Sequence, residues 1–148
     1  MAIQVNIEKN FKGFSLKSVF ESNTAATGIL GASGSGKSMT LRCIAGIETP
    51  DRGKIVINGR TVFDSEKKIN LKPQERRIGY LFQNYALFPW LKVGENIEYP
   101  MKKMKVPKEE RKKRVQEICE VVGLTQYLDR KPATLSRGQR QRVALARA

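Results

Sequence analysis

The sequence predicts an α/β fold in which strands and one helix are followed by a basic, helical second part. Three observations support this prediction. In the first part, apolar residues alternate with polar ones, which is the pattern of strands with one buried face. A glycine-rich loop then stands between a short apolar run and a helical stripe. Beyond residue 90, apolar residues recur at the spacing of helices.

Several strands and one helix are predicted before residue 60. Two alternating stretches predict strands, the first marked by Ile3, Val5 and Ile7 and the second by Phe14, Leu16 and Phe20. A short apolar run at residues 25–30 predicts a further strand, which stops at the glycine-rich loop. The helical stripe that begins at Met39 ends near Gly46.

A hairpin, a buried strand and three helices follow. Asn58-Gly59 lies between β-branched residues and predicts a type I′ turn, because that turn needs a positive φ at both positions. Residues 78–82 predict another buried strand. Helices are predicted over residues 92–101, 107–122 and 136–148. Pro107 suits the first turn of the second helix, and Gly123 suits its C-terminal cap.

Composition excludes several classes of protein. The 148 residues include 28 Lys+Arg and 14 Asp+Glu, which gives a formal charge of +14. No histidine is present, and the only cysteines are Cys43 and Cys119, which excludes a zinc site, a His-based catalytic triad and a disulfide framework. No apolar run reaches the roughly 18 residues of a membrane-spanning helix, and no signal-peptide pattern is present. We therefore expect a protein of the reducing cytosol.

The positive charge is partly local. Residues 102–114 hold eight basic residues against Glu109 and Glu110. We expect a solvated helix face there, with contact to a partner as the alternative. A charge of this sign attracts polyanions or anionic membrane surfaces, but it does not specify a fold.

The glycine-rich loop carries the most specific functional motif. Its residues are Gly31-Ala32-Ser33-Gly34-Ser35-Gly36-Lys37-Ser38, which fit G-x-x-x-x-G-K-[ST] at every fixed position. Glycines let backbone N–H groups curl around phosphate oxygens, and the positive end of the next helix points at them. Lys37 can reach the β- and γ-phosphates, and Ser38 can ligate Mg²⁺. We predict that these eight residues and Met39 bind a nucleotide; the alternative is a flexible loop that precedes a helix by chance.

A second motif stands near the C-terminus. It consists of Leu135-Ser136-Arg137-Gly138-Gln139, in which Ser136 and Gln139 predict a capping box that opens a helix. Alone, the motif predicts only a well-capped amphipathic helix. Together with the phosphate loop it resembles the signature motif of ABC-transporter ATPases, whose consensus is L-S-G-G-Q, so Arg137 departs at the third position. The resemblance covers essentially the whole chain. It implies that Ser136, Arg137, Gly138 and Gln139 contact the ATP held by a partner copy.

Between the two motifs, residues 81–97 resemble the Q-loop region of the same family. Gln83 is expected at the end of a core strand. The resemblance implies that it contacts Mg²⁺ and the attacking water and links the core to a helical subdomain. The pattern L-F-P-x-x-x-V-x-x-N-I, which starts at Leu87, resembles importers in particular. The alternative is a strand end followed by an aromatic packing cluster.

The segments before the Q-loop resemble the ATPase of molybdate importers. They are Asn58-Gly59-Arg60, Phe63-Asp64-Ser65-Glu66-Lys67-Lys68 and Leu71-Lys72-Pro73-Gln74-Glu75-Arg76-Arg77-Ile78-Gly79-Tyr80. Relatives that import maltose or polyamines typically have a shorter link before the Arg-Arg-Ile-Gly-Tyr position. Sulfate and tungstate importers remain alternatives, because the permease and its binding protein select the ion.

The resemblance implies a phosphate-loop NTPase core of the ABC-ATPase type with an antiparallel β flank and a helical subdomain. Residues 1–90 would form the core and flank, and residues 91–148 the helical subdomain and signature helix. The chain stops before the family's Walker B strand, its Asp-Glu pair and its switch histidine, so we expect nucleotide binding without turnover by this chain alone. The resemblance implies an adenine-stacking aromatic residue in the N-terminal β region, and Phe11 is the best candidate because Phe14 is in register with Leu16 and Phe20, which are expected to be buried. The alternative is that Phe11 is a simple core residue.

By the same resemblance, the chain is the cytoplasmic ATP-binding subunit of an ABC importer, a transport ATPase on the inner face of the cell membrane. Its cofactors would be ATP and Mg²⁺. Its partners would be a membrane permease and a second copy, with which it would sandwich two ATP molecules. The alternatives are a DNA-repair or chromosome-maintenance ATPase and a nucleotide-binding fragment that does not hydrolyse ATP. A DNA-repair or chromosome-maintenance ATPase would have a coiled-coil insertion with heptad repeats between the two motifs. Pro89, Pro100 and Pro107 argue against such an insertion, so we expect no nucleic-acid partner.

Overall fold

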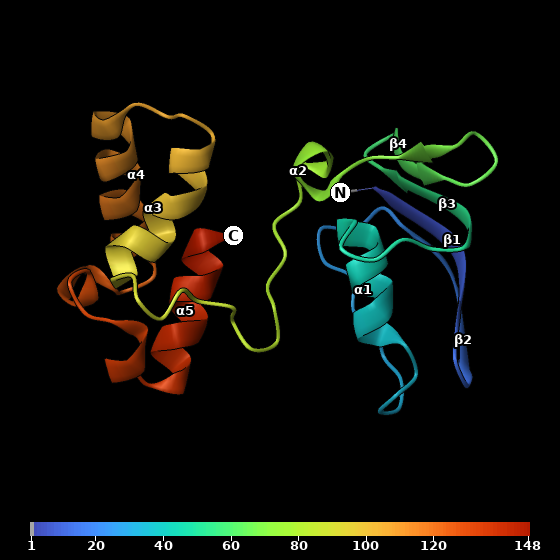
Figure 1. The fold of residues 1–148 in the computed structure, drawn as a ribbon, viewed down its shortest axis with the longest axis horizontal. Coiled ribbons are helices and arrows are strands. Elements are labelled where there is room, and N and C mark those ends of the chain that lie inside the picture. Colours follow the sequence, from blue (N-terminus) through green and yellow to red (C-terminus); the bar gives the residue numbers. More distant parts are fainter. Residues whose placement is uncertain (1) are drawn as a thin grey trace. The chain divides into compact units, whose positions relative to one another are not determined.

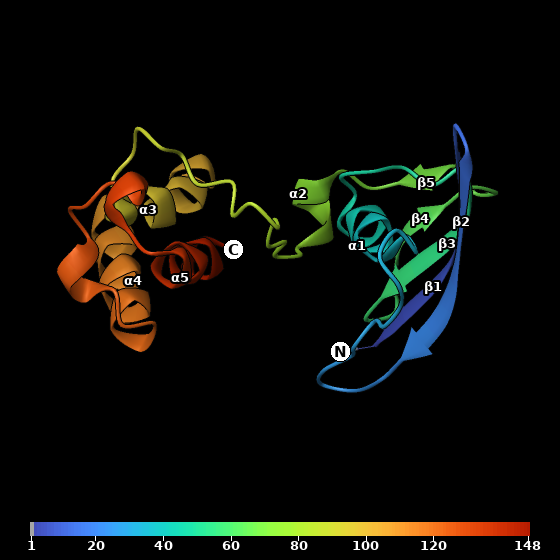
Figure 2. The ribbon, with the colours of Figure 1, turned by 90° about the horizontal axis from the view of Figure 1, so that it is seen from below.

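The computed structural model describes residues 2–148. The chain divides between Gly79 and Tyr80 into two compact units, which we call the sheet unit (residues 2–79) and the helical unit (residues 80–148). Figure 1 shows the elements of each unit, and Figure 2 shows them after a turn of 90°. The division into residues 1–90 and 91–148 that the sequence suggests stays a prediction.

The sheet unit is built on an antiparallel sheet with the strand order β2-β1-β3-β4-β5. Its strands are β1 (Ile3–Phe11), β2 (Phe14–Ser22), β3 (Arg52–Ile57), β4 (Arg60–Asp64) and β5 (Ile69–Asn70). On β1, Ile3, Val5 and Ile7 are buried, whereas Gln4 and Asn6 are exposed. The alternation therefore predicts the first strand correctly, and the second predicted strand is β2.

Helix α1 (Lys37–Ala45) covers the buried face of this sheet (Figure 2). Its Cys43 and Ile44 pack in one apolar cluster with Ile7, Ile55 and Phe63 from the strands. Burying each such side chain contributes about 1.5–3 kcal/mol. Burial also raises the pKa of the Cys43 thiol to about 11, so this cysteine is an unreactive packing residue.

The predicted hairpin is confirmed. Asn58 and Gly59 join β3 to β4 with φ angles of 49° and 76°, so both have the positive φ that a type I′ turn requires. The Asn58 side chain also accepts a hydrogen bond from the Ala2 backbone N at 3.0 Å. The turn is thereby attached to the beginning of β1.

Two predicted strands are wrong. Residues 25–30 and 78–82 run as irregular chain, and Leu30 is 95% exposed. A buried strand needs hydrogen-bonded neighbours, and within residues 2–148 no strand lies beside either segment. Their apolar composition indicates a tendency to be buried, but it does not reveal whether a pairing strand is present. Gln83 therefore follows an irregular segment instead of ending a core strand.

The C-terminal end of α1 is bound by Arg76, the last residue of α2 (Pro73–Arg76). The Arg76 side chain lies in the core, because the residue is only 4% exposed. Its guanidinium donates to four oxygens: Cys43 O at 2.8 Å, Ile44 O at 2.9 Å, Leu71 O at 2.8 Å and Asn70 Oδ1 at 3.0 Å. Two of these are carbonyl oxygens in the last turn of α1. Cys43 O also accepts from Gly46 N at 3.2 Å, and Arg76 completes the hydrogen bonding of this helix end.

Gly46 makes room for this contact. It follows α1 with a φ of 78°, and a Cβ atom there would lie 2.5 Å from Arg76 Nε. Only glycine therefore allows both the left-handed helix end and the close approach of the guanidinium.

The helical unit packs three helices around a second apolar core. They are α3 (Val93–Lys103), α4 (Lys108–Val121) and α5 (Arg137–Arg147), with the short 3₁₀ helices η1 (Thr125–Tyr127) and η2 (Pro132–Thr134). α3 contacts both α4 and α5. All three helices were predicted, and Gly123 follows α4 with a φ of 66°. Pro107 lies just before α4 and not in its first turn, because its ψ of 144° is extended.

The basic stretch forms the end of α3, the following turn and the first half of α4. Lys112, Lys113 and Arg114 each pair with a glutamate on α4 itself. Such exposed pairs contribute only about 0.2–1 kcal/mol. The stretch is thus a solvated helix face, as expected. In the part of the chain that the structure describes, no helix is long and apolar enough to cross a bilayer.

Removing the Arg76 side chain should destabilise the sheet unit. Arg76→Ala removes the guanidinium donors to Cys43 O and Ile44 O, and Cys43 O keeps only its bond from Gly46 N, so we expect the free energy of unfolding in urea to fall by about 2–3 kcal/mol. Arg42→Ala is the matched control, because Arg42 is an exposed arginine on α1. A loss no larger in Arg76→Ala than in Arg42→Ala would contradict the role given to Arg76.

Candidate nucleotide-binding site

The phosphate loop, residues 31–38, leads directly into α1 and is shaped by its glycines. A Cβ on Gly31 would lie 2.6 Å from Ser35 Oγ, so the loop closes on itself there. Gly34 and Gly36 have φ angles of 80° and 91°, which other residues rarely adopt. A Cβ on Gly36 would also lie 2.4 Å from Leu16 Cδ1. The close approaches at Gly31 and Gly36 and the positive φ angles of Gly34 and Gly36 therefore favour glycine at these positions.

Lys37 folds back over the loop. Its Nζ donates to Gly31 O and Ala32 O, both at 2.7 Å, and lies 3.5 Å from Ser35 Oγ. The ammonium group is thus held in the hollow of the loop, next to the backbone that would cradle an anion.

Most backbone N–H groups of the loop are not used in hydrogen bonds to backbone carbonyl groups. Within residues 2–148, Ser35 is the only loop residue whose N–H donates to a backbone carbonyl, that of Ala32 at 3.2 Å. The first turn of α1 contains no acidic residue, and Ser38 is exposed there. Free N–H groups, a helix N-terminus and one cation together fit a polyphosphate. The residues that sequence reasoning assigned to the phosphate loop therefore lie together in one suitable geometry.

Two aromatic rings lie beside the loop. Phe14 is 40% exposed, and its Cζ lies 3.3 Å from the position that a Cβ on Gly36 would take. Phe11 stacks on Phe14 with ring centroids 6.2 Å apart. Phe14 lies on the Leu16 face of β2, as expected, because both side chains approach Gly36, but as the first residue of the strand it is exposed instead of buried. Phe14 is therefore a candidate for base stacking that the alternating pattern concealed.

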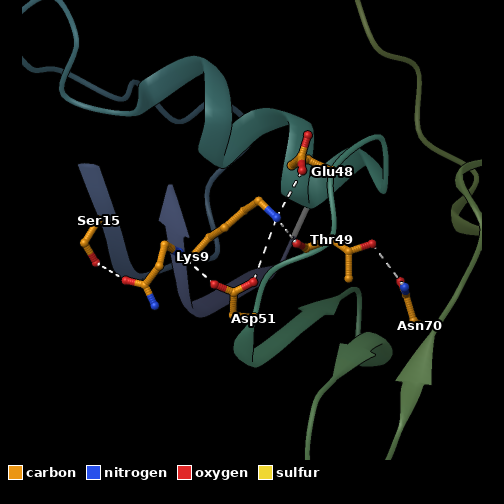
Figure 3. A network of polar contacts seen from close by, with 7 residues as sticks. Lys9, Ser15, Glu48, Thr49, Asp51 and Asn70 are labelled. Atoms are coloured by element: carbon orange, nitrogen blue, oxygen red, sulfur yellow. Dashed lines mark hydrogen bonds and ion pairs between the residues drawn. The ribbon is translucent and has the colours of Figure 1, made fainter. Parts of the chain in front are cut away.

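A partly buried lysine fixes the strand that carries Phe11. Lys9, whose side chain is 14% exposed, donates to Thr49 O at 2.7 Å and lies 3.1 Å from a Glu48 carboxylate oxygen. Its Nζ also lies 5.3 Å from the centre of the Phe11 ring. Asp51 in turn accepts from the Asn10 backbone N at 2.7 Å. Figure 3 shows the polar contacts of Lys9 and Asp51 together with those of Ser15 and Asn70.

Gln83 and the signature residues belong to the helical unit, whereas the phosphate loop belongs to the sheet unit. Gln83 is exposed and begins a turn at residues 83–86. Tyr85 and Ala86 in this turn have positive φ angles of 63° and 45°. The structure thus places Gln83 at a tight turn of the chain.

The predicted capping box is confirmed. The Ser136 side chain accepts from Gln139 N at 3.2 Å, and the Gln139 side chain accepts from Ser136 N at 2.8 Å. Such a cap contributes about 1 kcal/mol. Ser136, Arg137 and Gly138 are exposed at this helix end. Their contact with a partner's ATP stays a prediction.

Sequence reasoning assigned no role to Asn96, which is fully buried on α3. Its side chain makes four hydrogen bonds to the segment before α3: with Phe88 N at 2.8 Å, Phe88 O at 3.1 Å, Leu91 O at 3.1 Å and Lys92 O at 3.0 Å. The signal in the sequence is an asparagine beside the buried residues Val93 and Ile97. Asn96 therefore holds the segment after Gln83 against the helical core.

Comparison with known proteins gives matches over most of the chain. A model of the ABC transporter family matches residues 19–148. The trehalose/maltose import ATP-binding protein MalK of Thermococcus litoralis is 53% identical over 120 residues, which cover 81% of this chain and 32% of that protein. The molybdate/tungstate import ATP-binding protein WtpC of Archaeoglobus fulgidus is 45% identical over 148 residues, which cover 100% of this chain and 58% of that protein. The chain thus spans less than two thirds of the length of these relatives.

A solved structure is also similar. It is the ATP-binding cassette MJ0796 in a dimeric, post-hydrolysis state bound to ADP and Pi. The TM-score is 0.74 and the identity is 30%, with 99% of this chain and 68% of that chain covered. The predicted α/β fold of the ABC-ATPase type is therefore confirmed.

Two glycine substitutions in the loop should differ in their effect. Gly34→Ala meets no atom within 4 Å, so we expect only the left-handed backbone cost of about 1–2 kcal/mol. Gly36→Ala adds the clash with Leu16, and we expect a larger loss of unfolding free energy in urea. Equal losses in the two variants would show that Gly36 is not confined by β2.

Proposed function

Because this chain belongs to the ABC transporter family, we propose that it is the ATP-binding part of an importer and couples ATP to transport. The observation that carries this proposal is the phosphate loop, in which the Lys37 ammonium rests against Gly31 O and Ala32 O at 2.7 Å. The relatives that match the chain have import ATP-binding names, which supports the importer assignment.

The roles of the residues follow from their chemistry. Lys37 would donate to the β- and γ-phosphates, and the N–H groups of the loop would bind phosphate oxygens. Ser38 and Gln83 would hold Mg²⁺, which when bound neutralises phosphate charge and polarises the reacting oxygens. Phe11 and Phe14 provide aromatic surface for the base on the side of the loop next to β2.

A second copy and a membrane permease are the proposed partners. The similar cassette MJ0796 is dimeric, which supports association of two copies. In such a pair, the exposed N-terminal end of α5 from one copy would face the ATP of the other, with Ser136, Arg137, Gly138 and Gln139 at the contact. The subunit would then lie in the cytoplasm, on the inner face of the cell membrane. Residues 1–90 and 91–148 would act as core and helical subdomain.

Molybdate or a similar oxyanion is the proposed cargo. The WtpC relative matches along the full 148 residues, whereas the MalK relative matches 120 residues at higher identity. The support is the extent of the WtpC match, together with the resemblance of the link at residues 63–80 to that of molybdate importers. The structure folds this link into the end of β4, the strand β5 and the helix α2.

Loss of the Lys37 charge should weaken ATP binding. Lys37→Ala removes a charge-assisted contact of about 1.5–3 kcal/mol, so we expect the dissociation constant from calorimetry to rise roughly 10–150-fold. Lys67→Ala is the control, since Lys67 is an exposed lysine of the same unit. An unchanged affinity in folded Lys37→Ala protein would overturn the assignment of the loop.

The cargo is tested by uptake in the source cells. Cells that carry Lys37→Ala should accumulate less molybdenum than wild-type cells, and excess tungstate should compete in the wild type. Maltose uptake measured in the same strains serves as the control. A variant strain that loses maltose uptake and keeps normal molybdenum content would assign the chain to a sugar importer.

A further inference from the structure

Two arginines at opposite ends of α5 reach the same turn. Arg147, the last residue of α5, contacts the backbone of residues 85 and 86. Arg137, the first residue of α5, contacts the side chain of Tyr85. This turn directly follows Gln83, so both ends of the signature helix are attached to the Q-loop segment.

The Arg147 contact has the geometry of a fork. Its Nη1 donates to Ala86 O at 2.6 Å and its Nη2 donates to Tyr85 O at 2.9 Å. The guanidinium also lies 5.5 Å from the centre of the Phe88 ring. Two parallel donors and a flat cation are features of arginine that lysine lacks.

The turn itself explains why such a partner is needed. Tyr85 and Ala86 have φ angles of 63° and 45°, and each non-glycine residue in this conformation costs about 1–2 kcal/mol. Consecutive residues that share the left-handed helical conformation point their carbonyl groups in about the same direction. Those of Tyr85 and Ala86 therefore face one guanidinium together, and the contact offsets the strain.

Arg137 provides a second, weaker attachment. Its Nε lies 3.4 Å from the Tyr85 hydroxyl oxygen, and both groups are near the surface. Arg137 is also the residue at which this chain departs from the L-S-G-G-Q consensus. The departure thus coincides with a contact to the Q-loop segment.

We propose that Arg147 is a positioning residue that holds the turn after Gln83 on α5, and that Arg137 secures the same turn through Tyr85. Gln83 and the Ser136 end of α5 then keep a fixed separation and move as one body. This inference rests on the proposed function for its significance, because Gln83 would serve the ATP of its own copy and Ser136 the ATP of a partner.

The inference is tested by pulsed EPR distances between spin labels at Asn84→Cys and Arg140→Cys. Both positions are exposed, and the native Cys43 and Cys119 are fully buried, so the labels attach selectively. The parent protein should give one narrow distance distribution. In Arg147→Gln its width should rise about twofold, because the turn opens locally. Arg147→Lys should fall between the two, and Arg142→Gln, at an exposed arginine of the same helix, should leave the width unchanged.

Urea unfolding of the same proteins separates positioning from simple stabilisation. A merely structural role would lower the free energy of unfolding and leave the distribution narrow in the folded protein. An unchanged width in folded Arg147→Gln overturns the proposal. Tyr85→Phe and Arg137→Gln should each broaden the distribution slightly, and combining them should add nothing further.

Nucleotide measurements distinguish this inference from the proposed function. ATP affinity from calorimetry should be the same in Arg147→Gln and the parent, since the phosphate loop lies in the sheet unit. In the assembled importer, kcat for ATP should fall roughly 10–100-fold while KM stays unchanged. If the parent itself fails to bind ATP, the proposed function fails, whereas the EPR distances measured without nucleotide still decide the role of Arg147.

Discussion

The geometry of the phosphate loop depends on how the two ends of α1 are satisfied. At the C-terminal end, the buried Arg76 donates to Cys43 O and Ile44 O at 2.8 and 2.9 Å. At the N-terminal end, Ser35 is the one loop residue within residues 2–148 whose N–H donates to a backbone carbonyl, so the other loop N–H groups are available to an anion. The carbonyl groups at the C-terminal end of α1 are thus hydrogen-bonded inside the protein. The N–H groups at its N-terminal end stay available, and they give that end the positive charge that attracts an anion. The same helix also carries Cys43 and Ile44 into the sheet core, so packing and anion binding share one element.

What could be predicted from the sequence depends on how local the cause is. The turn at Asn58-Gly59 and the capping box at Ser136 were predicted correctly, because each depends on residues within four positions of one another. The strand predicted at residues 25–30 failed because a strand depends on a neighbour, which no local pattern reports. Contacts between residues far apart in the sequence could not be predicted either. Nothing near Arg76 in the sequence indicates that its partners lie at residues 43 and 44.

The candidate site follows the same rule. The phosphate loop is one contiguous motif, so its eight residues were found together. Phe14 was assigned to the correct face of β2, but its exposure was not predicted, because a period of two assigns faces and does not say where along a strand burial ends. Asn96 is the N of the L-F-P-x-x-x-V-x-x-N-I pattern, but its structural role was missed because its partners are backbone groups, which carry no signature of their own. Sequence patterns therefore located the phosphate loop, whereas the structure was needed to find the contacts that hold the surrounding segments in place.

The Lys37 contact with Gly31 O and Ala32 O at 2.7 Å has a consequence for the energetics of ligand capture. In the free protein the ammonium is already chelated by the loop, so most of its rotamer freedom is lost on folding and not on association. When phosphate binds, Lys37 Nζ exchanges the carbonyl oxygens of Gly31 and Ala32 for phosphate oxygens. The entropic cost of ordering Lys37 on binding is correspondingly small, and its contribution to affinity depends on the difference in charge between the carbonyl and the phosphate oxygens. A neutral ligand of the same shape gains nothing from that exchange and leaves the lysine where it is.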